Sequence, residues 1–372
     1  MNYVKQRMLT GTNVGIVFGC FAPLHQGHLD AIMRAKKEND GGCLVVLSGY
    51  ENDRGSDIMP FNKRYRYIRE YFADDDLVSV YAIDEAELGI AGYNDQWDIW
   101  LAECRNIWDI AARGANPVWY VGETEYKDAL EARGHKVVLL DRSDNPISAT
   151  MIRENPVKHW DKIAFPFRRV FSHNILITGT ASEGKTTLTA DLGKYFNAPY
   201  SHEYAIDYIK ESCIAEWELD GTDYIAFLDG QYNLNRSLIN SRGNQGIFFS
   251  DTDAIVTKMY AEYYSKDETC AITEEEYRKV AILADDYIRK ARWDKIFLLA
   301  PKGVFVDDGI RYMKHASLDS RHEMFNILCR ELKDAGLWDK VTILQDGYYG
   351  NFQAVVKYTE GVIACGKAET VV

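Results

Sequence analysis

Short apolar runs alternate with amphipathic stretches along the first half of the chain. Between the runs, apolar positions recur with the period of a helix, as in Phe61–Phe72 and Gln96–Arg113. Strands separated by helices form βαβ units, so the pattern predicts a parallel sheet with right-handed crossovers. The predicted strands are Val14–Cys20, Cys43–Gly49, Leu77–Ile83, Val118–Gly122 and Lys136–Leu140.

A second alternation of the same kind starts at Asn174. Its predicted strands are Asn174–Thr178, a short one near Pro199–Ser201, Gly246–Asp251, Lys295–Ala300 and Val341–Gln345. Its predicted helices include Lys185–Phe196, Thr222–Asn240 and Thr273–Arg292. We therefore expect an α/β protein with two doubly wound parallel-sheet domains, the first Rossmann-like.

The segment from about Arg153 to His173 interrupts this rhythm with Pro156, Pro166 and the basic pair Arg168–Arg169. Such a composition is typical of a connection between domains. We place a linker at residues 161–172, between domains at residues 1–160 and 173–372. A chain of 372 residues fits this division at roughly 100–200 residues per domain.

Composition excludes several classes of function. The apolar content of 47% and the charged content of 27% are those of a globular protein. A net charge of -13 repels polyanions, so we expect no nucleic-acid partner.

No apolar run approaches the ~20 residues that cross a bilayer, and no signal-peptide pattern opens the chain, so membrane insertion is not expected. None of the seven cysteines forms a CxxC pair, which opposes a zinc ribbon and suggests reduced thiols in a cytoplasmic protein. Assembly into a homo-oligomer stays open.

The first candidate site lies where the first predicted strand ends and a helix begins. Glycines let the backbone approach a ligand closely, and a helix N-terminus attracts phosphate. Two histidines add donors on the same side, and a metal pair is disfavoured because no suitable third ligand lies nearby in the sequence. The residues of this run are Gly19, Phe21, Pro23, His25, Gly27 and His28. They resemble the GxFxPxHxGH signature of the nucleotidylyltransferase superfamily.

A second motif follows the fifth predicted strand. Ser148, Thr150 and Arg153 resemble the ISxTxxR motif of the same superfamily. The hydroxyls and the guanidinium fork would bind phosphate oxygens of ATP. Taken alone, this pattern is more often a helix cap.

The second candidate site is the run Gly179–Thr186, which matches the P-loop pattern G-x-x-x-x-G-K-[ST] between a predicted strand and a predicted helix. Its amides would hold the phosphates of ATP, Lys185 would reach the β and γ oxygens, and Thr186 would bind Mg²⁺. The expected ATP-binding residues are Gly179, Ser182, Gly184, Lys185, Thr186 and Thr187. An acid inside such a loop is unusual, and we expect Glu183 to point outward.

Further charged residues would complete a kinase. Asp251, at the end of a strand, would bind Mg²⁺, although a helix cap is the alternative for it and for Asp253. Glu203 would hold or deprotonate a sugar hydroxyl, or would merely complement a helix dipole. Arg311 and Arg321 would cover the transferring phosphoryl group from a lid; otherwise they are surface arginines.

Together these motifs resemble the NadR type of bifunctional nicotinamide-mononucleotide adenylyltransferase/ribosylnicotinamide kinase. The resemblance extends from about Asn13 to Val362. It rests on both phosphate motifs, on the ISATMIR run, and on four further runs: Tyr93–Trp100, His202–Tyr204, Asp251–Asp253 and Val306–Arg311.

The resemblance implies two linked reactions in NAD salvage. The second domain would phosphorylate nicotinamide riboside with ATP, and the first would join nicotinamide mononucleotide to AMP from ATP, giving NAD and pyrophosphate. It also implies catalytic roles for His25, His28 and Arg153 in the first domain. In the second domain those roles fall to Lys185, Glu203, Asp251, Arg311 and Arg321. Tyr204 and Asp253 would contact the riboside, and Trp97 would stack on nicotinamide unless it belongs to the helix core.

Two departures from the family pattern affect these expectations. The first predicted strand is reached by Val14, so we expect neither a helix-turn-helix module nor a repressor role. Ile206 stands where the family pattern has an arginine. Two rival interpretations are a fused pantetheine-phosphate adenylyltransferase/dephospho-coenzyme A kinase and a non-catalytic NAD or ATP sensor.

Overall fold

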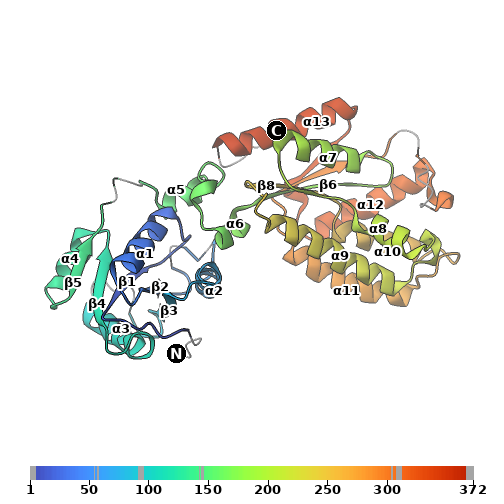
Figure 1. Ribbon diagram of the computed structural model, residues 1–372. Coiled ribbons are helices and arrows are strands. Elements are labelled where there is room, and N and C mark those ends of the chain that lie inside the picture. The colour runs from blue at the N-terminus through green and yellow to red at the C-terminus, as the bar shows by residue number, and fades with distance from the viewer. Residues whose placement is uncertain are drawn as a thin grey trace. The chain divides into compact units, whose positions relative to one another are not determined.

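The computed structural model describes residues 6–53, 55–56, 58–90, 96–141, 143, 146–302, 305–306 and 312–365. The chain divides into two compact units, residues 1–171 and 172–372 (Figure 1). Each unit has its own sheet and its own hydrophobic core.

The first unit contains a five-stranded sheet in the order β3-β2-β1-β4-β5. All its strand pairs are parallel, with Val17 beside Val45 and Gly15 beside Val118. Its strands are β1 (Asn13–Gly19), β2 (Cys43–Gly49), β3 (Val78–Asp84), β4 (Asn116–Val121) and β5 (Lys136–Leu139). The strand order reverses at β1, and ligands of open α/β sheets bind at such a point, beyond the carboxyl ends of the strands.

Helices cover both faces of this sheet. One face packs on α1, α2, α5 and α6, and the other packs on α3 and α4. Every residue of β2 is buried, which explains why its sequence is a continuous apolar run. The helices are α1 (Gln26–Glu38), α2 (Phe61–Tyr71), α3 (Trp97–Ala111), α4 (Thr124–Glu131), α5 (Ala149–Glu154) and α6 (Phe165–Phe171).

The second unit contains a five-stranded parallel sheet in the order β10-β9-β6-β8-β7. Its strands are β6 (His173–Gly179), β7 (Tyr200–Ser201), β8 (Ile247–Asp251), β9 (Lys295–Leu299) and β10 (Val341–Leu344). Here the order reverses at β6, the strand that leads into the predicted P-loop. The topology therefore gives the second unit the same kind of ligand-binding edge as the first.

The helices of the second unit form two layers around this sheet (Figure 1). The main core joins the sheet to α8–α12, while α7 packs beside α13 on the other face, where Phe196 stacks on Phe249. The helices are α7 (Lys185–Phe196), α8 (Tyr204–Ser212), α9 (Gly221–Ile239), α10 (Ala254–Tyr264), α11 (Glu274–Lys290), α12 (Leu318–Asp334) and α13 (Tyr348–Cys365).

The α/β fold class and the predicted strands are confirmed, but the predicted linker is placed too early. Residues 160–162 form a 3₁₀ turn and α6 follows it. Trp160, Phe167 and Phe171 are buried in the core of the first unit. The segment 161–171 therefore belongs to that unit, because its aromatic side chains pack into the core. The two prolines and two arginines nearby gave the segment the composition of a linker.

Candidate active sites

The first site is the loop that joins β1 to α1. His25 directly precedes α1, its side chain is buried, and its ring lies 3.8 Å from that of His28, measured between centroids. The rings of Phe21 and His28 make an edge-to-face contact, with their centroids 4.9 Å apart. The first turn of α1 carries no acidic residue, so its positive end is not neutralised from within the helix. Two adjacent imidazoles at such an end suit an anionic ligand.

The ISATMIR motif lies against this loop, although it is far away in the sequence. Arg153 donates to the carbonyl of Ala22 at 2.6 Å and to the hydroxyl of Thr150 at 3.1 Å. A Cβ on Gly27 would lie 3.6 Å from Ile147 and 3.2 Å from the ring of His25. The structure thus brings the two predicted halves of one site together.

Ser148 acts as the N-cap of α5, because its oxygen accepts a hydrogen bond from the amide of Met151 at 3.2 Å. The helix-cap alternative is therefore correct for this residue. A hydroxyl that accepts in a cap still has its own proton to donate, so the predicted phosphate contact remains a prediction.

Arg64 is a residue of this site that sequence reasoning missed. Its side chain is 0% exposed, lies 2.8 Å from Asp53, and donates to the carbonyl of Cys20 at 3.0 Å. A Cβ on Gly55 would lie 2.3 Å from the Cβ of Ala22, so the segment around Asp53 packs directly on the loop. Two arginines, Arg64 and Arg153, therefore hold the backbone of the loop through its carbonyls. The signal in the sequence is the position of Arg64 on the buried face of α2, three and four residues before Tyr67 and Ile68.

Trp97 is the first residue of α3 and is 7% exposed. Its ring makes edge contacts with Phe18, Trp100 and Tyr126 at centroid distances of 6.2, 5.7 and 5.8 Å. The helix-core alternative accounts for this burial, and stacking on nicotinamide stays a prediction. The neighbouring residues Tyr93, Asn94 and Asp95 lie outside the described part of the chain.

The second site is the P-loop between β6 and α7. Gly184, with a φ of 83°, immediately precedes α7, and Gly179 approaches the backbone so closely that a Cβ would lie 2.8 Å from the carbonyl oxygen of Leu299. Lys185 donates to the carbonyl of Thr180 at 2.9 Å. Thr186 donates to Asp251 at 2.5 Å, so the two predicted Mg²⁺ ligands are adjacent.

The remaining predicted ATP contacts surround this loop. Ser182 has a φ of 63° and exchanges hydrogen bonds with the backbone of Val306. Thr187 is exposed in the first turn of α7. Their direct contact with ATP stays a prediction.

Glu183 does not point outward as expected. Its side chain is 3% exposed and forms a 2.7 Å ion pair with Arg321 of α12, whose side chain is equally buried. Burial raises the pKa of Glu183, while the backbone amide of Lys302 and Arg321 oppose that rise. Arg321 is therefore neither a surface arginine nor a free lid residue. Arg311, with Asp307–Ile310, lies outside the described residues.

Beside the P-loop, a cavity opens between α8, α9 and α10. Glu203 and Glu216 contribute buried carboxylates to its wall, and Thr252 contributes the residue that follows Asp251. Its aromatic lining consists of Tyr224, Phe227, Tyr260 and Tyr264. Ile206, the departure from the family pattern, also lines it. Aromatic and apolar side chains with a few polar groups among them are the usual lining of a small-molecule site.

Tyr204 and Asp253 directly follow Glu203 and Thr252, which line this cavity. The amide of Tyr204 donates to Gln231 at 2.8 Å, and the ring of Tyr204 packs on Gly230 of α9. Asp253 caps α10 by accepting from Ile255 and also accepts from Trp293 at 2.7 Å, while burial raises its pKa to about 6. The helix-cap alternative is thus correct for Asp253, and its contact with the substrate stays a prediction.

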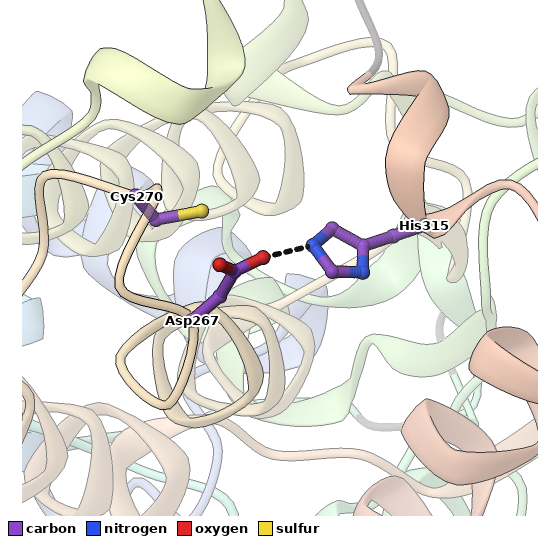
Figure 2. A group of neighbouring side chains, drawn as sticks. All are labelled: Asp267, Cys270 and His315. Atoms are coloured by element: carbon purple, nitrogen blue, oxygen red, sulfur yellow. Dashed lines mark hydrogen bonds and ion pairs between the residues drawn. The ribbon is translucent and has the colours of Figure 1, made fainter.

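One group of neighbouring side chains, Asp267, Cys270 and His315, has the composition of a metal site (Figure 2). However, the ammonium of Lys314 lies 2.8 and 2.7 Å from the two carboxylate oxygens of Asp267. His315 bonds Asp267 through Nε2 at 2.8 Å and Tyr263 through Nδ1 at 3.2 Å. A lysine at the carboxylate competes with a cation, so we assign no metal here. The network instead fixes residues 313–315 to the turn after α10.

Known protein families match each of the two units separately. A cytidylyltransferase-like family model matches residues 16–155, and an AAA domain model matches residues 174–349. The trifunctional NAD biosynthesis/regulator protein NadR of Salmonella typhimurium is 30% identical over 93% of this chain and 82% of its own length. The chain belongs to the NadR family. The Escherichia coli member is 28% identical over 92% of this chain and 82% of its own.

Two solved NadR structures match the whole fold. A complex with NR has a TM-score of 0.84 at 39% identity and covers 98% of this chain and 99% of the other. A complex with NAD and AMP-PNP has a TM-score of 0.82 at 38% identity, with the same coverage. The resemblance expected from the motifs is confirmed. In the described part of the chain, no helix has the length and apolar character to cross a membrane.

Proposed function

We propose that this chain is a bifunctional NAD salvage enzyme. The second unit phosphorylates the 5′-hydroxyl of nicotinamide riboside with ATP. The first unit transfers the adenylyl group of ATP to nicotinamide mononucleotide, giving NAD and pyrophosphate. The observation that supports this most is the presence of two strand–loop–helix phosphate sites in separate cores, in a family with members solved with NR and with NAD plus AMP-PNP.

In the second unit, the P-loop holds ATP and the neighbouring cavity holds the riboside. Nicotinamide in the riboside is a flat cation, so its ring favours the faces of the aromatic lining and the carboxylate of Glu216. Glu203, buried at the start of α8, would accept the proton of the ribose hydroxyl. The hydroxyl oxygen then forms a bond to the γ-phosphorus as the bond to the β-γ bridging oxygen breaks. Lys185 stabilises the charge that develops.

The residues around Asp251 fit a divalent cation. Thr186 and Asp251 offer a hydroxyl and a carboxylate at 2.5 Å from each other, and hard oxygen ligands of this kind suit Mg²⁺. When bound there, Mg²⁺ would neutralise phosphate charge. Asp251 is 0% exposed and is the last residue of β8, so the sheet fixes its position.

In the first unit, catalysis needs positioning and charge stabilisation but no protein nucleophile. A phosphate oxygen of the mononucleotide bonds to the α-phosphorus of ATP, and pyrophosphate leaves. His25, His28 and Arg153 would bear the charge on the triphosphate, because all three lie on one loop and its neighbouring motif. Trp97 and the half-buried Phe18 would flank nicotinamide. Both reactions use ATP, which agrees with the cytoplasmic location that we infer.

The test is to supply the purified protein with ATP and one acceptor at a time. With nicotinamide riboside, the protein should convert ATP to ADP. With nicotinamide mononucleotide, it should form NAD and release pyrophosphate. Lys185→Ala should abolish the first reaction and leave the second within about threefold, and His28→Ala should do the reverse. Turnover of pantetheine phosphate without either pyridine substrate would contradict the proposal, as would binding of ATP without turnover of any acceptor. Loss of both activities in one folded variant would contradict the division between units.

A further inference from the structure

Glu183 places a negative charge inside a loop that is built for a polyanion. It directly precedes Gly184 and Lys185 and is almost completely shielded from solvent. Solvent screens a buried charge poorly, so an unneutralised carboxylate here would oppose the binding of a triphosphate. A loop with this residue needs a compensating charge.

Arg321, which lies in α12 far from the P-loop in sequence, supplies that charge. Its Nη1 lies 2.7 Å from one oxygen of Glu183, and the backbone amide of Lys302 donates to the other oxygen at 3.0 Å. Ser182 exchanges hydrogen bonds with Val306 in the same segment. Two consecutive residues of the P-loop are therefore tied to Lys302, to Val306 and to α12.

The burial of the pair also decides what Arg321 can do. If its guanidinium moved to the phosphoryl group, Glu183 would stay behind as an unpaired carboxylate next to the triphosphate. Breaking a buried ion pair in this way is strongly unfavourable. The guanidinium of Arg321 also lies 5.9 Å from the centroid of the Phe305 ring, so an aromatic contact holds its side chain as well as the ion pair.

We propose that Glu183 and Arg321 form a neutralised strut that positions the phosphate loop, and that Arg321 acts on ATP only through Glu183. Arg321 is then a positioning residue rather than a contact to the transferred phosphoryl group. This inference rests on the proposed kinase activity of the second unit.

A double-mutant cycle tests the strut. Arg321→Met should raise the KM for ATP in riboside-dependent ADP release at least about tenfold, because Glu183 is left unneutralised. Adding Glu183→Gln to that variant should return the KM to within about threefold of wild type, because the opposing charge is gone. If Arg321 touches phosphate, the double variant will stay as impaired as Arg321→Met, and the proposal is overturned.

A second variant keeps the test decisive if Arg321→Met does not fold. Arg321→Lys retains the positive charge but lacks the planar fork, so it should keep both kcat and the KM for ATP within about threefold. A fall in kcat of about thirtyfold or more at unchanged KM would instead reveal a transition-state contact and overturn the strut.

Calorimetric titration with ADP separates failure of the strut from failure of the proposed function. Lys185→Ala serves as the blank for binding outside the P-loop. If the wild-type chain binds ADP but does not phosphorylate the riboside, the proposed activity fails while the affinities of the Arg321 and Glu183 variants still test the strut. Affinities that show no coupling between the two positions would overturn it.

Discussion

Gly230 provides a sharp test of how the riboside cavity is positioned. It lies in the interior of α9, where glycine costs about 1 kcal/mol relative to alanine, so Gly230→Ala would ordinarily stabilise the helix. A Cβ at this position would, however, lie 2.1 to 2.3 Å from ring atoms of Tyr204. Ordinary contacts between carbon atoms are about 3.5–4.0 Å, so the ring must move by more than an ångström.

The magnitude follows from two opposing effects. Overpacking costs typically about 1–3 kcal/mol, which exceeds the gain of about 1 kcal/mol from helix propensity. We therefore expect the free energy of unfolding of the second unit to fall by about 0–2 kcal/mol. Tyr204 directly follows Glu203, so the displaced ring should also shift that carboxylate. Because a shift of about 1 Å can cost 10²-fold in rate, kcat/KM for the riboside should fall about 10–100-fold.

The assay measures riboside-dependent ADP release, thermal unfolding and, as an internal reference, NAD formation from the mononucleotide. Gly361→Ala is the matched control, because it lies in α13 and its added Cβ would meet no atom within 4 Å. That control should gain up to about 1 kcal/mol and keep the kinase activity. If Gly230→Ala unfolds at or above the wild-type temperature with unchanged riboside kinetics, Tyr204 does not position the cavity and the reasoning is wrong.

Three further predictions concern other parts of the molecule. Arg64→Met should lower adenylyltransferase kcat/KM at least about tenfold and leave the kinase unchanged, because the substitution frees the loop before His25. Equal effects on both activities would instead indicate general unfolding. Thr186→Ala should raise the Mg²⁺ concentration for half-maximal kinase activity several-fold, as measured by metal titration at fixed ATP, without changing the Mg²⁺ dependence of NAD formation. Hydrogen bonding from Lys314 lowers the pKa of Asp267, so its stabilisation is present above the ordinary aspartate pKa and is lost as pH falls. Asp267→Asn should therefore lower the unfolding temperature of the second unit at neutral pH, and the difference should shrink below roughly pH 4.

The sequence was sufficient for the strands and for both phosphate loops because their causes are local. Cys43–Gly49 is apolar throughout since both faces of β2 are buried. Gly184 precedes Lys185 because a left-handed residue must turn the chain into α7. Even the contact between the ISATMIR motif and the first loop could be expected, since both follow strands at the same edge of one sheet.

The roles of the remaining site residues could not be predicted, because they depend on partners far away in the sequence. Nothing near Glu183 indicates that Arg321 neutralises it, and nothing near Asp253 indicates that Trp293 occupies its second oxygen. Arg64 lies on the apolar face of a helix, where periodicity alone predicts a hydrophobic residue. Only the packed structure supplies the carbonyl and the carboxylate that make a buried arginine stable there.

The two sites meet the same electrostatic demand with different side chains. Each offers a helix N-terminus at the edge of a parallel sheet, but the first adds paired imidazoles and the second adds a lysine beside a threonine–aspartate pair. Because each set of side chains is anchored in its own hydrophobic core, substitutions at one loop should leave the other reaction intact.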